Sequence, residues 1–312
     1  MVFCASEGSA MALNAPLSEK KSDVKHNTGA KMTPDRAHNA SQHTSVSASI
    51  VLFHSDIDLF IATLEALATA TYQLKHKLQL FILDQSLDNV YTQRAQKACA
   101  ETLFAANITL NYQTSTTNKG YGAGHNQIPS SYVGDVHIVL NPDIELDPLA
   151  IANAMDLFDG HPELAVISPC GRLIDGSVDR LAKRHPSLLV LLLRAFAPQS
   201  AQRLFTRQLS RYEYRDLCMA QFIAPIELAS GCCMMIRRSV WQQLRGFDES
   251  YFLYFEDYDL SKRAAQYGVV AQCSQVKVLH HGGNAARKGM RHIFLFGQGL
   301  IRFFNRWGWK FI

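Results

Sequence analysis

The chain has 312 residues, of which 47% are hydrophobic and 19% are charged, and this composition is typical of one folded domain with appendages. The formal net charge of +4 is too small and too dispersed to indicate nucleic-acid binding, so no nucleic acid is expected as a partner. Seven cysteines without C-x-x-C spacing argue against a disulfide framework or a zinc site.

Residues 1–46 are expected to form a disordered tail. They are rich in Ser, Ala, Asn, His and Lys, and they lack the apolar periodicity that would bury enough surface to offset chain entropy. The opening residues also lack the basic start and apolar run of a secretory signal, and no run approaches the roughly 20 apolar residues that span a bilayer. We therefore expect a cytoplasmic protein.

Strand and helix patterns alternate from residue 47 onward. Apolar, β-branched runs at 47–53, 78–83, 108–112 and 136–140 are typical of strands, and helical patterns separate them. Such alternation predicts an α/β fold in which helices flank a mainly parallel central sheet. Ligands of such sheets bind at the carboxyl ends of the strands.

The second half of the chain is less regular. After a strand at 164–168, arginines interrupt the apolar runs of a long stretch at 180–216. Amphipathic basic stretches either pack on a core by one face or lie at a membrane interface, and the sequence leaves both interpretations open. A strand is expected at 228–236, and an aromatic, Arg-rich helix pattern covers 294–312.

Two acidic residues follow predicted strands. Asp84 can bind a ligand or cap the next helix, although Ser86 and Asp88 could fill the capping role instead. Asp143 ends an Asn-Pro-Asp turn that the proline stiffens. A single carboxylate there can bind a hard divalent cation or simply stabilise the turn.

A glycine-rich segment at 118–126 opens the helix after the third predicted strand. It resembles a phosphate-binding loop only superficially, because it does not follow the first strand and has no third glycine at the fingerprint spacing. A Rossmann dinucleotide-binding fold is therefore disfavoured.

Two further clusters could carry chemistry. Three carboxylates, Glu256, Asp257 and Asp259, precede a helix expected over 260–267, and Asp259 is expected to cap it. The aromatic residues just before them would partly desolvate a carboxylate and raise its pKa toward that of a useful base. Farther on, His280 ends a strand beside glycines, where an imidazole can reach a metal or a diphosphate.

In this order, the motifs resemble family 2 glycosyltransferases, especially the bacterial rhamnosyltransferase-like branch. The resemblance covers about residues 47–283, and the order and spacing of the motifs carry it. The matching segments are Ser49-Ile50-Val51, Leu83-Asp84, Asn118 through Asn126, Asn141-Pro142-Asp143, Ser230 through Arg238, Gly246 through Glu249, Tyr254 through Leu260, and His280-x-Gly282-Gly283.

The resemblance implies a GT-A fold over residues 47–285, followed by a C-terminal amphipathic helix at 286–312. It implies an inverting enzyme that moves a sugar, rhamnose or a related hexose, from a nucleotide diphosphate donor to a hydroxyl of a cell-surface polysaccharide precursor. The implied acceptor is lipid-linked or an oligosaccharide, and the implied cofactor is a divalent cation, Mg²⁺ or Mn²⁺. A peripheral contact with the inner face of the inner membrane is also compatible with the basic stretches.

The resemblance also implies roles for individual residues. Asp257 would be the base that deprotonates the acceptor, with Glu256 as the competing candidate. The remaining assignments are Asp84, Asn118, Gly120 and Asn126 to the nucleotide, Asp143 and His280 to the metal, and Gly231 and Tyr254 to the donor and acceptor pocket. Two positions depart from the family pattern: Gln85 replaces the usual Asn, and Asn284-Ala285 stands where the family often has a Ser.

Two alternatives were weighed against this assignment. A sugar nucleotidyltransferase would place a basic, glycine-rich loop after the first strand, where this chain has His54-Ser55-Asp56. A catalytically silent nucleotide-sugar-binding module would lack the base, whereas Asp257 is present. The sequence therefore favours an enzyme.

Overall fold

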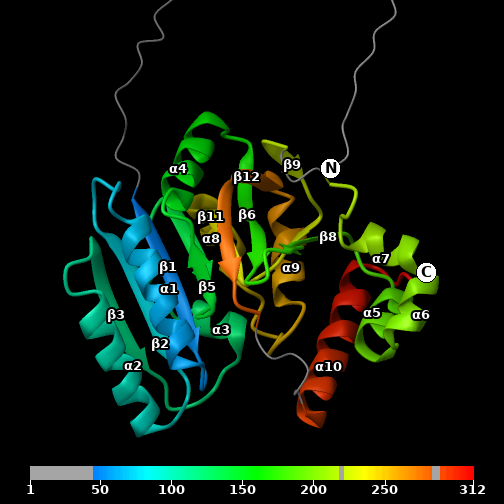
Figure 1. Cartoon of the computed structure of the whole chain (residues 1–312), viewed down its shortest axis with the longest axis horizontal. Helices are drawn as coiled ribbons and strands as arrows, with labels where there is room; N and C mark the ends of the chain where they lie inside the picture. Colours follow the sequence, from blue (N-terminus) through cyan, green and yellow to red (C-terminus); the bar gives the residue numbers. More distant parts are fainter. Residues whose placement is uncertain (1–44, 218–220, 283–288) are drawn as a thin grey trace, which may run out of the picture. The chain divides into compact units, whose positions relative to one another are not determined.

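The computed structural model describes residues 45–217, 221–282 and 289–312. Residues 1–44 of the predicted tail, Gly283, the Asn284-Ala285 departure and the predicted boundary after residue 285 lie outside the described residues, whereas Val46, the last residue of the predicted tail, begins the first strand. Most of the described strands form a ten-stranded sheet, in which eight strands follow the order β3-β2-β1-β4-β11-β6-β12-β5, and helices flank this sheet (Figure 1).

The described strands are β1 Val46–Leu52, β2 Leu78–Asp84, β3 Ile108–Thr114, β4 Val136–Leu140, β5 Ile144–Leu146, β6 Leu164–Leu173, β7 Val178–Asp179, β8 Ala182–Lys183, β9 Ile223–Pro225, β10 Leu228–Ala229, β11 Cys233–Arg237 and β12 Val269–His280. The described helices are α1 Ile57–Ala70, α2 Asn89–Thr102, α3 Tyr121–His125, α4 Ala150–Gly160, α5 Leu188–Phe196, α6 Gln199–Leu204, α7 Thr206–Tyr212, α8 Arg238–Leu244, α9 Glu256–Ala264 and α10 Met290–Trp307.

The four strands β3, β2, β1 and β4 are parallel, so the α/β class predicted from the alternating pattern is confirmed. β11 then lies antiparallel between β4 and β6. Its first residue, Cys233, is therefore in register with Leu140, the last residue of β4, and the Asn141 N–H donates to the Cys232 carbonyl at 2.8 Å. Because β11 runs antiparallel to β4, its beginning lies at the edge of the sheet at which β4 ends.

Asp84 does not cap the helix that follows it, because other acidic residues cap α1 and α2. The Asp88 carboxylate accepts the N–H groups of Val90 and Tyr91 and so begins α2, and Asp56 caps α1 in the same way. Asp84, at the end of β2, therefore has a different set of partners.

Residues 180–216 form the short strand β8 and the helices α5, α6 and α7, and these helices lie beside α10 (Figure 1). Their buried side chains, among them Val190 and Leu209, share one apolar cluster with Phe303 and Phe304 of α10. The amphipathic stretch thus packs on the protein by one face. Among the helices that the structure describes, none combines the length and the apolar character needed to cross a bilayer.

Two buried histidines lie in the core between β1, β4 and α3. The Ser49 Oγ is 2.7 Å from His125 Nδ1 and 3.0 Å from His137 Nε2, and Ser47 Oγ is 2.8 Å from His137 Nδ1. Burial lowers the pKa of His137 to about 3, and burial followed by the nearby charge of His137 lowers the pKa of His125 well below its ordinary value. Both imidazoles are therefore neutral at pH 7.

We expect these histidines to make the fold sensitive to acid. In the unfolded chain these histidines bind protons once the pH falls below about 6.5, whereas folded His137 binds one only near pH 3. Their contribution to the free energy of unfolding is therefore complete above pH 6.5 and is lost as the pH falls. The loss should be on the order of 1 kcal/mol per pH unit for each histidine. Urea unfolding of the wild type and of His137→Gln measures it: the variant should show the shallower pH dependence, and equal slopes would contradict the prediction.

Candidate active site

A cavity of about 570 Å³ lies beyond the carboxyl ends of the parallel strands. Segments that follow β1, β2, β3 and β4 meet there, as the geometry of a parallel sheet requires. Its lining residues are Val51, Phe53, His54, Ser55, Asp56, Leu59, Gln85, Asn118, Gly120, Tyr121, Asn141, Pro142, Asp143, Phe252, Leu253, Gly282, Arg291, His292 and Leu295.

The glycine-rich segment forms one wall of this cavity. The Asn118 carboxamide oxygen accepts the Gly120 N–H at 2.9 Å. The Gln85 side chain donates to the Gly120 carbonyl at 3.0 Å and accepts the Lys119 N–H at 2.8 Å. Gln85, the residue that departs from the family pattern, thus fixes the shape of this loop and lines the cavity as well.

Gly120 joins this wall to the segment that precedes α9. Its φ is +96°, and a Cβ at this position would lie 2.2 Å from the Phe252 carbonyl oxygen. The next residue, Tyr121, donates its N–H to the same carbonyl at 3.0 Å. A side chain at residue 120 would therefore separate two loops that the backbone holds together.

At the end of β4, two oxygen atoms are buried on the cavity wall without a hydrogen-bond partner among the described residues: Asn141 Oδ1 and Asp143 Oδ1. Buried polar atoms normally have a partner. Hard carboxylate and amide oxygens are the ligands that Mg²⁺, Mn²⁺ and Ca²⁺ prefer. No cluster of three or more His, Cys, Asp or Glu side chains suited to a metal occurs among the described residues, so a cation here would need further ligands from a bound molecule.

His280 lies between two carboxylates. Its Nε2 is 3.5 Å from Asp143 Oδ2, and its Nδ1 is 2.7 Å from Asp179 Oδ2. Burial disfavours the charged imidazolium, but the two carboxylates outweigh this effect and raise the pKa of His280 to about 9. His280 and Asp179 thus fix the orientation of the Asp143 carboxylate.

Asp257 is held by two backbone donors. Its Oδ2 accepts the Gly231 N–H at 2.8 Å, and its Oδ1 accepts the Tyr258 N–H at 2.8 Å. Burial raises the pKa of Asp257 to about 6, although these two donors and the positive charge of Lys183 act in the opposite direction. The carboxylate is therefore charged at pH 7, but it is far more basic than an ordinary Asp.

Glu256, the competing candidate for the base, is buried beside Asp257. It is 5% exposed, and its Oε2 has no partner among the described residues. Burial and then the charge of Asp257 raise the pKa of Glu256 well above its ordinary value. Asp257, whose charged form two backbone donors favour, is therefore the better suited of the two to accept a proton.

The strand predicted over 228–236 is interrupted, and this prediction was wrong for residues 230–232. The Gly231 N–H binds Asp257, and its carbonyl accepts the Tyr121 hydroxyl at 2.7 Å, so neither group joins a strand ladder. A Cβ on Gly231 would lie 3.1 Å from the Asp257 Cβ. Through these two hydrogen bonds, Gly231 connects the glycine-rich segment to the candidate base.

The helix predicted over 260–267 begins earlier, at Glu256. The two residues before it, Tyr254 and Phe255, have φ values of 72° and 69°. This left-handed conformation costs roughly 1–3 kcal/mol for each non-glycine residue, so surrounding contacts must impose it. Asp259 does not cap the helix, which corrects the expectation: it is fully buried and binds Arg263 at 2.6 Å and Trp307 at 2.9 Å.

Two neighbouring residues, Gly231 and Cys232, connect the segments that carry the two acidic groups. The Gly231 N–H donates to Asp257 at 2.8 Å, and the Cys232 carbonyl accepts the N–H of Asn141, two residues before Asp143, at 2.8 Å. The backbone between β10 and β11 thus links the end of β4 to the candidate base.

Solved structures share this architecture. A mannosyltransferase from Pyrobaculum calidifontis, determined with GDP-mannose and Mn²⁺, superposes with a TM-score of 0.57 at 14% identity, over 85% of this chain and 64% of that one. GalNAc-T7, determined with UDP, GalNAc and Mn²⁺, superposes with a TM-score of 0.54 at 14% identity, over 77% of this chain and 44% of that one. The chain has the GT-A glycosyltransferase fold.

Curated sequences confirm the resemblance that the motifs indicate. An N-acetylglucosaminyl-diphospho-decaprenol L-rhamnosyltransferase of Mycobacterium tuberculosis is 32% identical over 180 residues, which are 53% of this chain and 56% of the relative. The low-salt glycan biosynthesis hexosyltransferase Agl10 of Haloferax volcanii is 26% identical over 179 residues, 55% of this chain and 52% of the relative. The chain spans about half the length of these relatives. No protein-family model matches the chain.

Within this GT-A fold, three of the residues assigned from the motifs, Asn118, Gly120 and Asp143, line the cavity, and His280 contacts Asp143. Glu256 and Asp257 are not among the described residues that line it. Gly231 binds Asp257, as described above. The remaining pocket residue, Tyr254, contacts α10, where its hydroxyl is 2.9 Å from His292 Nδ1.

Two residues assigned to the nucleotide have structural partners instead of facing the cavity. The buried Asp84 carboxylate accepts hydrogen bonds from the Ser86 N–H at 2.9 Å, from Thr92 at 2.5 Å and from Tyr112 at 3.0 Å. The Asn126 carboxamide exchanges two hydrogen bonds of 2.9 Å with the backbone of Phe247. A direct contact of Asp84 or Asn126 with a nucleotide stays a prediction.

Two site residues were missed in the sequence. Asn141 belongs to the Asn-Pro-Asp turn, and a second side-chain oxygen two positions before Asp143 was a usable signal. Asp179 carried no signal, because it lies on the short strand β7, which reaches His280 only after pairing with β6. Long-range pairing of this kind is invisible to local patterns.

Proposed function

We propose that the protein is an inverting glycosyltransferase that moves a sugar from a nucleotide diphosphate donor to a hydroxyl of a cell-surface polysaccharide precursor. The observation that carries the proposal is the combination of Asp143, whose Oδ1 lies on the cavity wall without a partner among the residues that the structure describes, with Asp257, whose pKa is raised to about 6. The Asp143 oxygen is suited to bind a cation, and the Asp257 carboxylate is suited to accept a proton. The glycosyltransferase names of the relatives support this function.

The donor would occupy the cavity, with its nucleotide along Asn118 and Gly120 and its diphosphate toward Asp143. Asn141 and Asp143 supply hard oxygen ligands for Mg²⁺ or Mn²⁺, and the Mn²⁺ in two neighbours of the same fold agrees with this choice. When bound, the cation would neutralise the charge of the leaving diphosphate. His280 orients the carboxylate through the 3.5 Å contact with Asp143.

Asp257 would perform the proton transfer. Its carboxylate takes the proton from the acceptor hydroxyl as the oxygen attacks the anomeric carbon, and the bond from this carbon to the diphosphate oxygen breaks with its electron pair leaving on the diphosphate. Attack from the face opposite the leaving group inverts the carbon. The Gly231 and Tyr258 N–H groups hold the carboxylate in one orientation throughout.

A panel of nucleotide sugars tests the proposal. We propose dTDP-rhamnose as the donor and UDP-hexoses as the alternative, and N-acetylglucosaminyl-diphospho-decaprenol, which the name of the Mycobacterium relative contains, is the first acceptor to assay. Transfer with an inverted anomeric centre is the expected result. Binding of nucleotides, seen as a raised melting temperature, without transfer to any acceptor would instead favour a silent nucleotide-sugar-binding module.

We also propose a peripheral contact with the cytoplasmic membrane surface, where a lipid-linked acceptor would be presented. Exposed Phe294 and Ile301 on α10 support this contact, together with the exposed arginines Arg203 and Arg207 of the neighbouring helices. We expect cosedimentation with vesicles that contain anionic lipid but not with neutral ones. Phe294→Ser combined with Ile301→Ser should weaken it, and unchanged sedimentation would count against this surface.

A further inference from the structure

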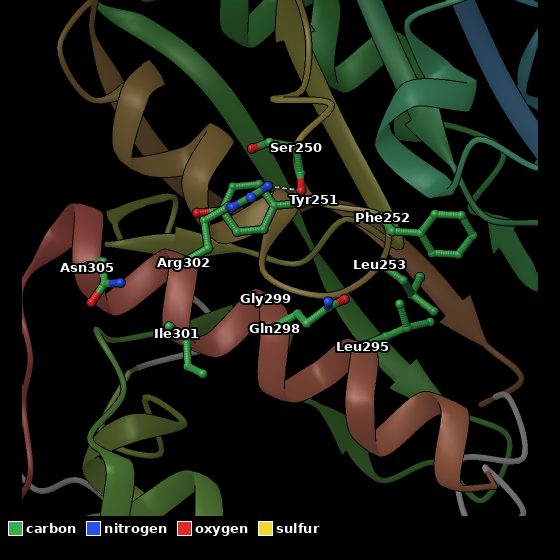
Figure 2. Close-up of a pocket in the computed structure, with 10 residues that line it drawn as sticks. All are labelled: Ser250, Tyr251, Phe252, Leu253, Leu295, Gln298, Gly299, Ile301, Arg302 and Asn305. Carbon is green, nitrogen blue, oxygen red and sulfur yellow. Dashed lines mark hydrogen bonds between the residues drawn. The ribbon is translucent and has the colours of Figure 1, made fainter.

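α10 contacts the polypeptide that leads into the candidate base. Figure 2 shows α10 running alongside the segment 250–253, with Gly299 and Arg302 on the side of the helix that faces it. The Arg302 guanidinium donates to the Ser250 carbonyl, and it lies 5.6 Å from the centre of the Tyr251 ring. The helix thus fixes the beginning of the segment that ends at Asp257.

At Gly299 the backbone of α10 comes close to the same segment. A Cβ at this position would lie 2.7 Å from the Tyr254 carbonyl oxygen and 3.1 Å from a carbon of the Phe255 ring. The backbone of α10 therefore touches the two left-handed residues that directly precede Glu256. A glycine in the middle of a helix lowers helix stability, and here the close contact gives a physical reason for it.

Aromatic side chains of α10 surround the same turn. The Phe255 ring packs against Phe296 and Phe303, with centroid separations of 5.1 and 5.6 Å. The Tyr254 hydroxyl is 2.9 Å from His292 Nδ1. These contacts are suited to offset the strain of two successive residues with positive φ.

α10 also fixes the first turn of α9 beyond the base. The Trp307 indole N–H donates to the buried Asp259 carboxylate at 2.9 Å, and Arg306 lies 3.1 Å from the same carboxylate. Asp257 thus lies between two points, the turn at residues 254 and 255 and the Asp259 carboxylate, that are both held by one helix.

We propose that α10 positions the catalytic base, with Gly299 as the positioning residue whose missing side chain sets the Tyr254–Phe255 turn and thereby the place of Asp257. This inference rests on the proposed glycosyl transfer. It assigns Gly299 a role through Asp257 and not through any contact with substrate. α10 and the segment before α9 also line part of the donor cavity, but the wall at Asn118 and Gly120 belongs to the loop after β3. The affinity for nucleotide should therefore change much less than kcat.

The test compares two glycines of the same helix. In Gly299→Ala the new methyl group meets the Tyr254 carbonyl, whereas in Gly297→Ala it meets nothing within 4 Å. We expect Gly299→Ala to lower kcat by about 10- to 100-fold with little change in donor KM, because a small displacement of a catalytic group has effects of this size. Gly297→Ala should match the wild type in both constants.

Amide hydrogen exchange at Gly231 provides a readout that does not depend on turnover, because this N–H is protected by Asp257. Exchange should be faster in Gly299→Ala and unchanged in Gly297→Ala. If wild-type protein transfers no sugar, the proposed function fails, and the exchange rates still decide the role of α10. Equal kcat and equal exchange in the two variants would overturn the inference.

A second variant decides the question if Gly299→Ala does not fold. Trp307→Phe keeps an aromatic ring in place and removes the N–H that binds Asp259. It should also lower kcat and speed Gly231 exchange, while leaving the binding of dTDP or UDP with Mn²⁺, measured by calorimetry, close to wild type. Wild-type kcat and exchange in Trp307→Phe would overturn the inference.

Discussion

Replacing Asp257 with Asn is expected to lower sugar transfer by roughly 10²- to 10⁴-fold while donor affinity changes little, because the change removes the proton acceptor and keeps the shape of the side chain. Steady-state rates and nucleotide titrations measure the two effects. Wild-type activity should also fall as the pH drops through about 6, since Asp257 must be deprotonated to act and its pKa is raised to that value.

Glu256→Gln is the matched control for this variant. The raised pKa of Glu256 favours its protonated form, which a Gln side chain imitates, so turnover should stay within a few-fold of wild type. An inactive Glu256→Gln beside an active Asp257→Asn would move the base to Glu256. Two active variants would place the base elsewhere. Melting temperatures must accompany both measurements, because each Asp257 oxygen accepts a backbone N–H that an Asn amide group cannot fully satisfy.

The second large effect is expected at Asp143. Asp143→Ala should lower turnover by about 10²-fold or more and weaken donor binding, because charge neutralisation by a metal is worth several kcal/mol. Excess EDTA should stop the wild-type reaction, and added Mn²⁺ or Mg²⁺ should restore it. Turnover assays and calorimetric titration of dTDP and UDP with and without Mn²⁺ measure these effects.

Asp156→Asn, on an exposed part of α4, is the control for loss of a negative charge, and it should behave as wild type. Full turnover of the wild type in excess chelator would exclude the metal role. Metal-dependent turnover that persists in Asp143→Ala would show that another residue holds the cation.

Much of the fold could be predicted from local pattern. The strand expected at 136–140 matches β4, and the first three strands agree within two residues at either end. The strands β1, β2 and β4 are buried almost throughout, so they are mainly apolar runs that end at polar residues, whereas β3 at the edge of the sheet is mostly exposed. The positions of Asp84 and Asp143 at strand ends followed directly from this pattern.

The surroundings of the base could not be predicted in the same way. Nothing local indicates that two aromatic residues at 254 and 255 adopt positive φ, because contacts with α10, far along the chain, impose that conformation. The buried ion pair of Asp259 with Arg263 likewise shifts the start of α9, and a first-turn Asp usually indicates a cap. Where tertiary contacts override local preference, single-sequence reasoning fails.

The antiparallel placement of β11 between β4 and β6 has a consequence for how such a protein could diversify. Under the proposed function, the loops before β5 contribute most of the donor contacts, while the residues from Gly231 onward place the base against the acceptor. The two specificities thus belong largely to separate stretches of the sequence, which meet where β11 begins beside the end of β4 and where Tyr121 binds Phe252 and Gly231. Under the proposed function, changes in the later stretch could therefore alter the acceptor while most of the donor contacts stay the same.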